Sequence, residues 1–436
     1  MKQRRPETTP AIARPDRRRF GLSSPLALLL LLVAAAPAAA QYREPGAELQ
    51  APPDRKDQLE KAMDEAPWHF GKARVAPWIG LRSIDYVREL DAQGRQRPGD
   101  WTATAGAGLR GYLKLGTHAI AAAHAITDYS WWQKQDERNA PLGRYGLGLF
   151  GWWNRLEGEV TARRDEDVSF LSSDLLVREP TRNETLAANA QVRILGSIAV
   201  FGGFTSDRTR IDASSNLTAV DPALLLDRDA TLARGGLRYL LRGSRGYVGA
   251  GAFSERTEFQ GTGADDARSN KGSSWYAESQ VRGNHVDVTL QYDHRDLEAD
   301  DSTFPGYSAG DGRAMIALHP GWRLRYQLYG SRQLQYSAQA LGTYIEEERE
   351  GAGVNLTIGE GALQLFYETG GDDYFGTTTR HEDVTARGAW LDFPVRRIRF
   401  RLGARQTDFE PAGGTKRTLR EALGAATLSF GGPGDW

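Results

Sequence analysis

Apolar and polar side chains alternate with a period of two along most of the chain after residue 72. The alternation is clearest in three segments, 286–293, 322–328 and 398–405. Because successive side chains of a strand point to opposite faces, each segment is predicted to be a strand with one apolar face. The opposite, polar face must meet water. The apolar sets are Val286, Val288, Leu290 and Tyr292; Trp322, Leu324, Tyr326 and Leu328; and Ile398, Phe400, Leu402 and Ala404.

Eight short turns and nine longer polar loops alternate between the predicted strands. This regular exchange of tight hairpins and long loops is typical of a transmembrane β-barrel. We therefore predict an all-β fold, a transmembrane antiparallel up-and-down β-barrel of about 18 strands, with 16 as the alternative. A soluble sandwich or propeller is the competing fold, but the chain shows no fixed repeat period of the propeller kind. The predicted strands are 72–87, 101–115, 118–132, 142–153, 156–166, 184–195, 197–207, 230–242, 246–258, 273–283, 285–295, 312–319, 322–332, 342–358, 361–370, 382–393, 398–408 and 418–430.

The first 40 residues have the composition of an export signal. A basic leader precedes a short apolar stretch, Leu26 to Ala36, and Ala38-Ala39-Ala40 offers a cleavage site of small residues. This order predicts a secretory signal peptide over 1–40. Its apolar stretch is too short to span a bilayer as a helix. We therefore expect a mature chain that begins near Gln41 and resides in the outer membrane.

Residues 41–71 form a separate piece before the predicted barrel, which covers 72–432. The segment 42–53 is rich in proline and reads as a periplasmic linker, and 54–66 has helical composition with a narrow apolar stripe. Two interpretations of this helix are open. It is either a solvated periplasmic helix or a plug or partner-docking helix.

Composition and charge narrow the function classes. Without residues 1–40, the chain keeps 48 basic and 54 acidic side chains, a net charge of about −6, so nothing suggests nucleic-acid binding. The chain has no cysteine, which excludes disulfides, thiolate metal sites and cysteine nucleophiles. The histidines lack the spacing of a zinc site. We predict no cofactor and no bound metal.

Two segments carry a resemblance to known proteins. The stretch from Phe70 to Arg82 and the stretch from Asp100 to Arg110 are similar to a loosely defined group of Gram-negative outer-membrane barrel porins. Some members of that group accompany exopolysaccharide export genes. The resemblance implies a porin-type barrel over 72–430. The C-terminal pattern departs from the family because the chain continues past Phe430 to Trp436.

The polar faces of the predicted strands place many arginines in the lumen, and several of them lie near the short turns. A ring of basic side chains in a pore favours anions. The alternative is that these arginines pair with carboxylates across strands. The predicted pore-lining residues are Arg238, Arg242, Arg282, Arg323, Arg325, Arg399, Arg401, Glu278 and Asp287.

The loops also contain acidic clusters. Clustered carboxylates can bind calcium or magnesium, but none of these has the spacing of a defined calcium loop, so we expect solvated loop residues. The clusters are Asp265-Asp266, Asp300-Asp301, Glu346-Glu347-Glu348 and Asp372-Asp373.

Catalytic signals are weak. The stretch from Gly306 to Gly310 matches G-x-S-x-G by letters, but that motif works only at a strand-to-helix turn of an α/β sheet. His294 and His381 lie near acidic residues at the long-loop ends of strands, and neither has an identifiable serine partner. We therefore expect a protein that is not an enzyme.

The sequence predicts an outer-membrane porin-like channel for passive diffusion of small hydrophilic solutes, with a preference for anions. A non-conducting surface protein associated with exopolysaccharide export is the alternative, and a barrel lipid hydrolase is the third possibility. The expected partners are outer-membrane lipid, the barrel-assembly machinery, and polysaccharide or small anions.

Overall fold

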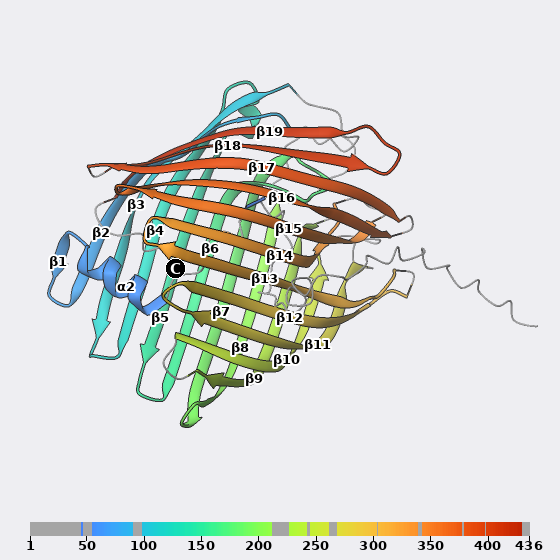
Figure 1. Ribbon diagram of the computed structural model, residues 1–436. Coiled ribbons are helices and arrows are strands. Elements are labelled where there is room, and N and C mark those ends of the chain that lie inside the picture. Colours follow the sequence, from blue (N-terminus) through green and yellow to red (C-terminus); the bar gives the residue numbers. More distant parts are fainter. Residues whose placement is uncertain are drawn as a thin grey trace, which may run out of the picture.

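The chain folds into one closed antiparallel sheet. The computed structural model describes residues 45–46, 55–89, 98–211, 226–241, 245–260, 268–302, 304–338, 342–376, 379–396 and 398–429. Strands β2 to β19 pair in sequence order, and β19 pairs with β2, which closes a barrel of 18 strands (Figure 1). A further short strand, β1, forms a hairpin with β2. The predicted fold class and strand number are confirmed.

The strands are 13 to 18 residues long, apart from β1. The helical elements are α2 (Arg55–Asp64) and η2 (Asp136–Arg138). The strands are β1 (Trp68–Phe70), β2 (Ala73–Val87), β3 (Asp100–Leu115), β4 (Ala119–Trp132), β5 (Ala140–Trp152), β6 (Leu156–Phe170), β7 (Arg178–Leu195), β8 (Ile198–Ile211), β9 (Arg228–Leu240), β10 (Arg245–Phe259), β11 (Asn270–Arg282), β12 (Val286–Ala299), β13 (Tyr307–Gly321), β14 (Leu324–Tyr336), β15 (Gly342–Ile358), β16 (Gly361–Gly376), β17 (Arg380–Val395), β18 (Ile398–Pro411) and β19 (Arg417–Ser429).

The strand register places the apolar faces as the alternation predicts. Leu290 of β12 lies between Ser279 and Ala314 of the neighbouring strands. Gln291, one position later, lies beside Glu278 and faces the other way. One face of each strand therefore carries the apolar side chains and the other carries the polar ones.

The apolar face points away from the barrel axis. Leu147, Leu195 and Leu237, on three different strands, expose 65%, 67% and 56% of their surface. Large side chains of this kind rarely form a continuous exposed surface on a soluble protein. A continuous apolar belt is what the outer wall of a membrane barrel requires. No helix in the described part of the chain is long and apolar enough to cross a membrane.

The strands extend further at the long-loop end than the sequence predicts. The predicted loop 296–311 is largely strand, since β12 continues to Ala299 and β13 begins at Tyr307. The predicted loop 371–381 is likewise occupied by β16 and β17. The hydrogen bonds of a ladder join backbone groups, so pairing continues beyond the point where the apolar alternation ends.

Candidate functional site: the lumen and its two mouths

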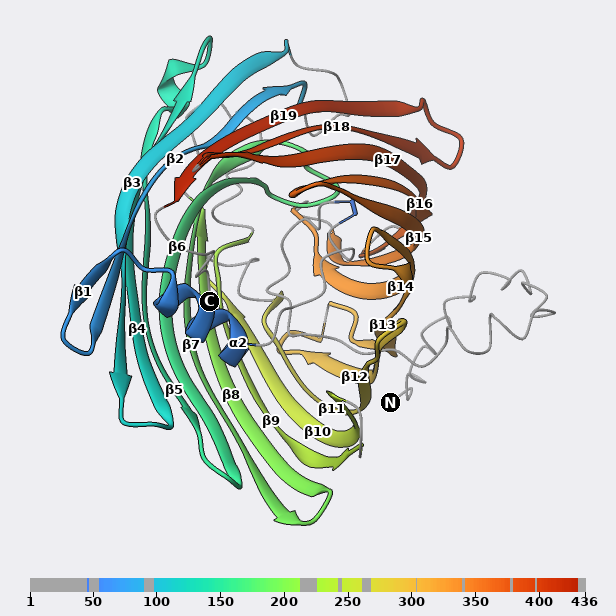
Figure 2. The same cartoon turned by 60° about the vertical axis from the view of Figure 1, so that its left-hand side comes forward.

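The segment between β6 and β7, which the sequence predicted as a long polar loop over 167–183, folds into the barrel. Residues 171–177 are all buried. Leu176 packs with Val384, Phe409 and Leu419 of β17 to β19. Figure 2 shows the ends of β6 and β7 curving beneath β16 and β17. This segment, which we call the inward loop (residues 171–177), therefore narrows the lumen near its long-loop end.

Polar contacts hold the tip of the inward loop. Asp174 accepts hydrogen bonds from Ser172, from Ser337 Oγ at 2.5 Å and from the backbone N–H of Ala338 at 3.2 Å. Ser337 and Ala338 follow β14, which lies in another sector of the wall. The contacts therefore join two parts of the barrel that are about 160 residues apart in sequence.

A cluster of buried ion pairs lies in the long-loop half of the lumen, beside the inward loop. Arg178 lies 3.1 Å from Asp85 and 2.9 Å from Glu421, and Arg405 lies 2.6 Å from the second oxygen of Glu421. These four side chains are nearly inaccessible to solvent. Truncating one member of such a cluster leaves its partners charged and unpaired, which is costly.

Two of the acidic clusters lie in strands and are partly buried, contrary to the prediction of solvated loops. Glu346, Glu347 and Asp372 are buried, whereas Glu348 is exposed and Asp373 is half-buried. Asp372 is 0% exposed and lies 2.6 Å from Arg349, whose guanidinium is also 3.6 Å from Glu347 and 3.7 Å from Glu368. The register explains the grouping, because Glu347 and Asp372 are direct partners in β15 and β16. One arginine thus contacts three carboxylates. Asp265-Asp266 lies outside the described residues.

The N-terminal helix α2 is packed inside the barrel. The apolar side chains along one side of the helix are buried, and Leu59 is 0% exposed. The stripe contacts side chains that β3, β4 and β5 direct into the lumen (Figure 2). The apolar stripe of α2 is therefore buried against the inner wall of the barrel. The contacting residues are Leu59, Ala62, Met63, Tyr112, Ile120, Ala122 and Phe150.

A second contact holds the N-terminal segment against β16, on another side of the lumen. The backbone N–H of Gly46 donates to Glu368 Oε2 at 3.2 Å, and Tyr329 donates its hydroxyl to the same oxygen at 2.8 Å. Gly46 has φ +80°, and a Cβ at this position would lie 3.1 Å from the ring of Phe366. Glycine is therefore the residue that fits this contact.

The predicted pore-lining pair Arg238 and Glu278 faces the lumen. Arg238 Nε donates to Glu278 Oε1 at 2.6 Å, and Nη1 donates to Gln191 Oε1 at 3.0 Å. The guanidinium also lies 4.1 Å from the ring centroid of Phe201 and 4.3 Å from that of Tyr247. Arg238 is thus a paired cation fixed in the wall between β7 and β11.

A second group lies at the short-turn mouth, on β11 to β14. Asp287 Oδ2 is 2.9 Å from His319 Nε2 and 3.7 Å from Arg325 Nη2. Arg282 is the direct neighbour of Asp287 in the register. The Nε and Nη2 atoms of Arg325 are buried and have no hydrogen-bond partner among the described residues. This group therefore contains more basic side chains (Arg282, Arg325 and His319) than acidic ones (Asp287).

The third group belongs to β17 and β18. Arg399 Nε donates to Asp392 Oδ1 at 2.6 Å, and the guanidinium of Arg401 lies 4.7 Å from the ring centroid of Trp390. Those of the predicted arginines that the structure describes therefore lie in three groups along the wall, on β9, on β11 to β14 and on β18.

Two predicted arginines remain to be placed. Arg323 lies in the turn between β13 and β14, with its guanidinium 4.4 Å from the ring centroid of Trp322. Arg242 lies outside the described residues.

The two histidines considered for hydrolysis lie on the outer parity of their strands. His381 is half exposed, with its ring nitrogens 2.7 Å from Asp373 and 3.3 Å from Asp383. The ring of His294 lies 6.1 Å from that of Trp275. Among the hydrogen bonds found in the described ranges, none joins a serine to either histidine.

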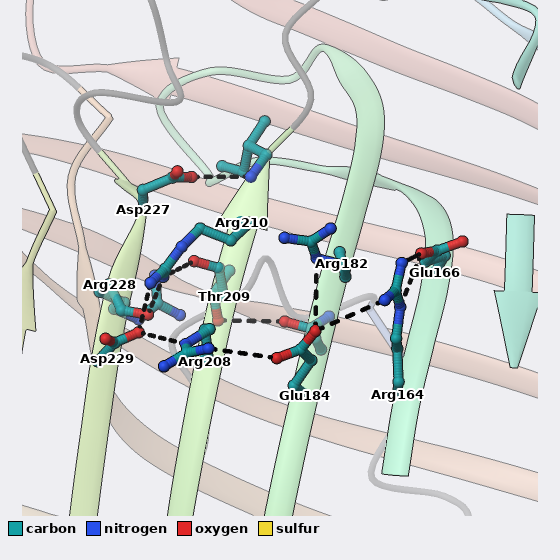
Figure 3. A network of polar contacts seen from close by, with 12 residues as sticks. Arg164, Glu166, Arg182, Glu184, Arg208, Thr209, Arg210, Asp227, Arg228 and Asp229 are labelled. Carbon is teal, nitrogen blue, oxygen red and sulfur yellow. Dashed lines mark hydrogen bonds and ion pairs between the residues drawn. The ribbon is translucent and has the colours of Figure 1, made fainter. Parts of the chain in front are cut away.

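A ladder of alternating charges runs across the outer face of β6 to β9. Arg208 lies 3.6 Å from Glu184 and 3.2 Å from Asp229, and Arg164 lies 3.9 Å from Glu184 (Figure 3). Leu186 follows Glu184 on the same face and is half exposed. The change from apolar to charged side chains marks the edge of the outward apolar belt at the long-loop end.

Comparisons with known proteins agree with this architecture. No protein-family model matches the sequence, and no curated protein matches it either. Solved structures do match. A BenF-like porin from Pseudomonas fluorescens Pf-5 aligns with a TM-score of 0.53 and 9% identity over 83% of this chain and 100% of that chain. The Pseudomonas aeruginosa channel OccK2 (OpdF) aligns with a TM-score of 0.50 and 9% identity over 83% and 98%. The chain thus has the fold of outer-membrane porin barrels.

Proposed function

We propose that the chain is an outer-membrane channel for the passive diffusion of small hydrophilic solutes, and that it prefers anions. One observation carries the proposal: a closed 18-stranded barrel has an apolar outer face and a lumen lined by charged and polar side chains. A water-filled passage through a membrane needs this distribution. The similarity to porin structures supports the fold on which the proposal rests.

The preference for anions rests on the short-turn mouth. Arg282, Arg323 and Arg325 lie there with Asp287 as the nearby carboxylate. An excess of cationic side chains around a narrow passage raises the local concentration of anions.

A non-conducting surface protein is the second candidate, and a specific observation favours it. Both α2 and the inward loop lie within the barrel. The two segments reduce the free cross-section of the lumen. A barrel whose lumen they close would conduct no solute and would act as a membrane anchor for its surface loops.

Planar-bilayer recording of the refolded mature protein separates the two candidates. A steady ohmic conductance in 1 M salt, on the order of that of other water-filled barrels, supports the channel. A protein that shows the heat-modifiable migration of a folded barrel but carries no current supports the surface protein. The salt-gradient reversal potential then measures the preference for anions.

A further inference from the structure

The hairpin of β1 and β2 exposes two aromatic side chains at the short-turn end of the barrel. Trp68 and Phe70, both on β1, have 47% and 65% of their surface accessible. β1 pairs with the first residues of β2, on the edge of β2 that pairs with β19 from Trp78 onward. The hairpin therefore lengthens the wall beside the point at which the barrel closes.

The strand register places both aromatic side chains on the outward face. Phe70 is opposite Ala73 of β2, and Ala73 is in turn opposite Leu113 of β3, which is 40% exposed. Because cross-strand partners share one face of a sheet, Phe70 and Leu113 belong to the same outward surface. Trp68 lies two residues before Phe70 and points the same way. The aromatic face of β1 is therefore continuous with the outward apolar belt.

The level of the hairpin along the barrel axis identifies its surroundings. Exposed apolar residues continue to the short turns on other strands, since β3, β7 and β15 end at Leu115, Leu195 and Ile358. The short-turn rim therefore lies at the boundary between hydrocarbon and lipid headgroups, where membrane barrels carry a girdle of aromatic side chains. Lys72, in the exposed turn of the hairpin, adds a positive charge that suits lipid phosphates.

The hairpin is also closely connected to α2. The helix ends at Asp64 and β1 begins at Trp68, so only three residues join them. Ala66, in this connection, is 2% exposed, and its backbone oxygen lies 2.9 Å from His69 Nε2. Figure 2 shows α2 inside the barrel and β1 at its rim. The position of β1 therefore limits how far α2 can move from the inner wall.

We infer that the β1–β2 hairpin is a membrane anchor for the N-terminal segment. Trp68 and Phe70 insert between the headgroups and the hydrocarbon of the leaflet at the short-turn side, and this contact with lipid keeps α2 at the inner wall. The inference goes beyond the proposed function, because a barrel that carries no current would be anchored in the same way.

Spin labels measure the lipid contact directly, because the chain has no cysteine of its own. The mature protein is labelled at Phe70→Cys and reconstituted in vesicles of phosphatidylethanolamine and phosphatidylglycerol. Oxygen concentrates in hydrocarbon, whereas a nickel chelate stays in water. We expect the label at Phe70→Cys to collide mainly with oxygen, as does a label at Leu147→Cys in the belt. His69→Cys, on the opposite face of β1, is the matched control and should collide mainly with nickel.

Two results of the collision measurement overturn the anchor. A label at Phe70→Cys that prefers nickel as strongly as the one at His69→Cys places the hairpin in water. A label at Phe70→Cys that neither reagent reaches places it against a second copy of the chain. Heat-modifiable migration of each variant establishes that it is folded.

A label on the exposed side of α2, at Lys61→Cys, tests whether the anchor holds the helix. Combining it with Trp68→Ser and Phe70→Ser should increase its mobility, seen as narrower spectral lines. Trp322→Ser with Tyr326→Ser removes two exposed aromatic side chains from another sector and should leave the mobility at the parent value. Equal mobility in all three backgrounds overturns the inference that the anchor holds α2.

Discussion

At the scale of single residues, parity along a strand decides whether a side chain meets the outer belt or the lumen. Leu290 and Gln291 are adjacent in β12 and face opposite ways. An arginine in the outer belt enters hydrocarbon, whereas an arginine in the lumen joins Glu278 and Asp293 in a polar surrounding. The same substitution at the two positions therefore has different costs.

The first prediction uses this difference. Leu290→Arg should destabilise the barrel by about 2–4 kcal/mol if the position lies near the membrane midplane. Gln291→Arg should cost much less, because its neighbour Glu278 is acidic. Urea titration of both variants in lipid vesicles measures the difference. Equal sensitivity at the two positions would show that the assignment of faces is wrong.

The second prediction concerns Glu421, which pairs with both Arg178 and Arg405. Glu421→Gln removes the charge that balances two buried guanidinium groups. We expect a loss of about 3–5 kcal/mol of folding free energy, as for other broken buried ion pairs. The same urea titration in vesicles measures it.

Glu258→Gln is the control for this experiment. Glu258 pairs with Arg256 at 2.6 Å, but both side chains are about half exposed. An exposed pair contributes less than about 1 kcal/mol. If the two glutamine variants lose the same stability, the Glu421 cluster is not a buried, energetically coupled unit.

At the scale of elements, the strands could be predicted from the sequence and the internal segments could not. The segments 286–293 and 398–405 alternate because each strand separates two environments, and that alternation is readable locally. The inward loop is different. Leu176 finds its partners on β17 to β19, more than 200 residues later, and no local pattern encodes that meeting.

The residues of the candidate site could likewise be predicted from the sequence only in part. Lumenal arginines were identified from parity alone, whereas their partners depend on which strands neighbour one another in the closed barrel. The pairing of Arg238 with Glu278 crosses from β9 to β11 and requires the register. Arg325 was predicted as a lumenal residue near a short turn, whereas the residues around it, from the β11–β12 turn and from β15, follow only from the strand order and register.

The third prediction tests α2 as a plug. Leu59→Asp places a charge in the fully buried contact with β3 to β5, which should release the helix from the wall. Single-channel conductance should then rise, while the strands keep their heat-modifiable migration. Lys61→Asp introduces the same residue on the exposed side of the helix and should leave conductance close to that of the parent. Unchanged conductance in both variants would mean that α2 does not limit the current.

At the scale of the whole molecule, the charged side chains differ along the barrel axis, from the long-loop end to the short-turn end, as well as between the inner and outer faces. Buried ion pairs and the inward loop occupy the long-loop half, and Arg323 and Arg325 lie at the short-turn mouth with Asp287 as the nearby carboxylate. On β6 to β9 the outer face carries a charged ladder at the long-loop end, next to the exposed Leu186 (Figure 3). Ion selectivity should therefore depend on the lumenal arginines and be independent of the outer ladder.

The last prediction follows from this arrangement. Replacing Arg323, Arg325, Arg399 and Arg401 by glutamine removes four positive charges and leaves Asp287 and Asp392 at the mouth. The reversal potential in a salt gradient should shift from anion preference towards neutral or cation preference. The shift should be largest at low salt, because screening is weakest there. Replacing the outer-face arginines of Figure 3 by glutamine removes a similar charge from outside the lumen and should leave the reversal potential unchanged. A parent channel that already prefers cations would contradict the anion preference and leave the barrel fold intact.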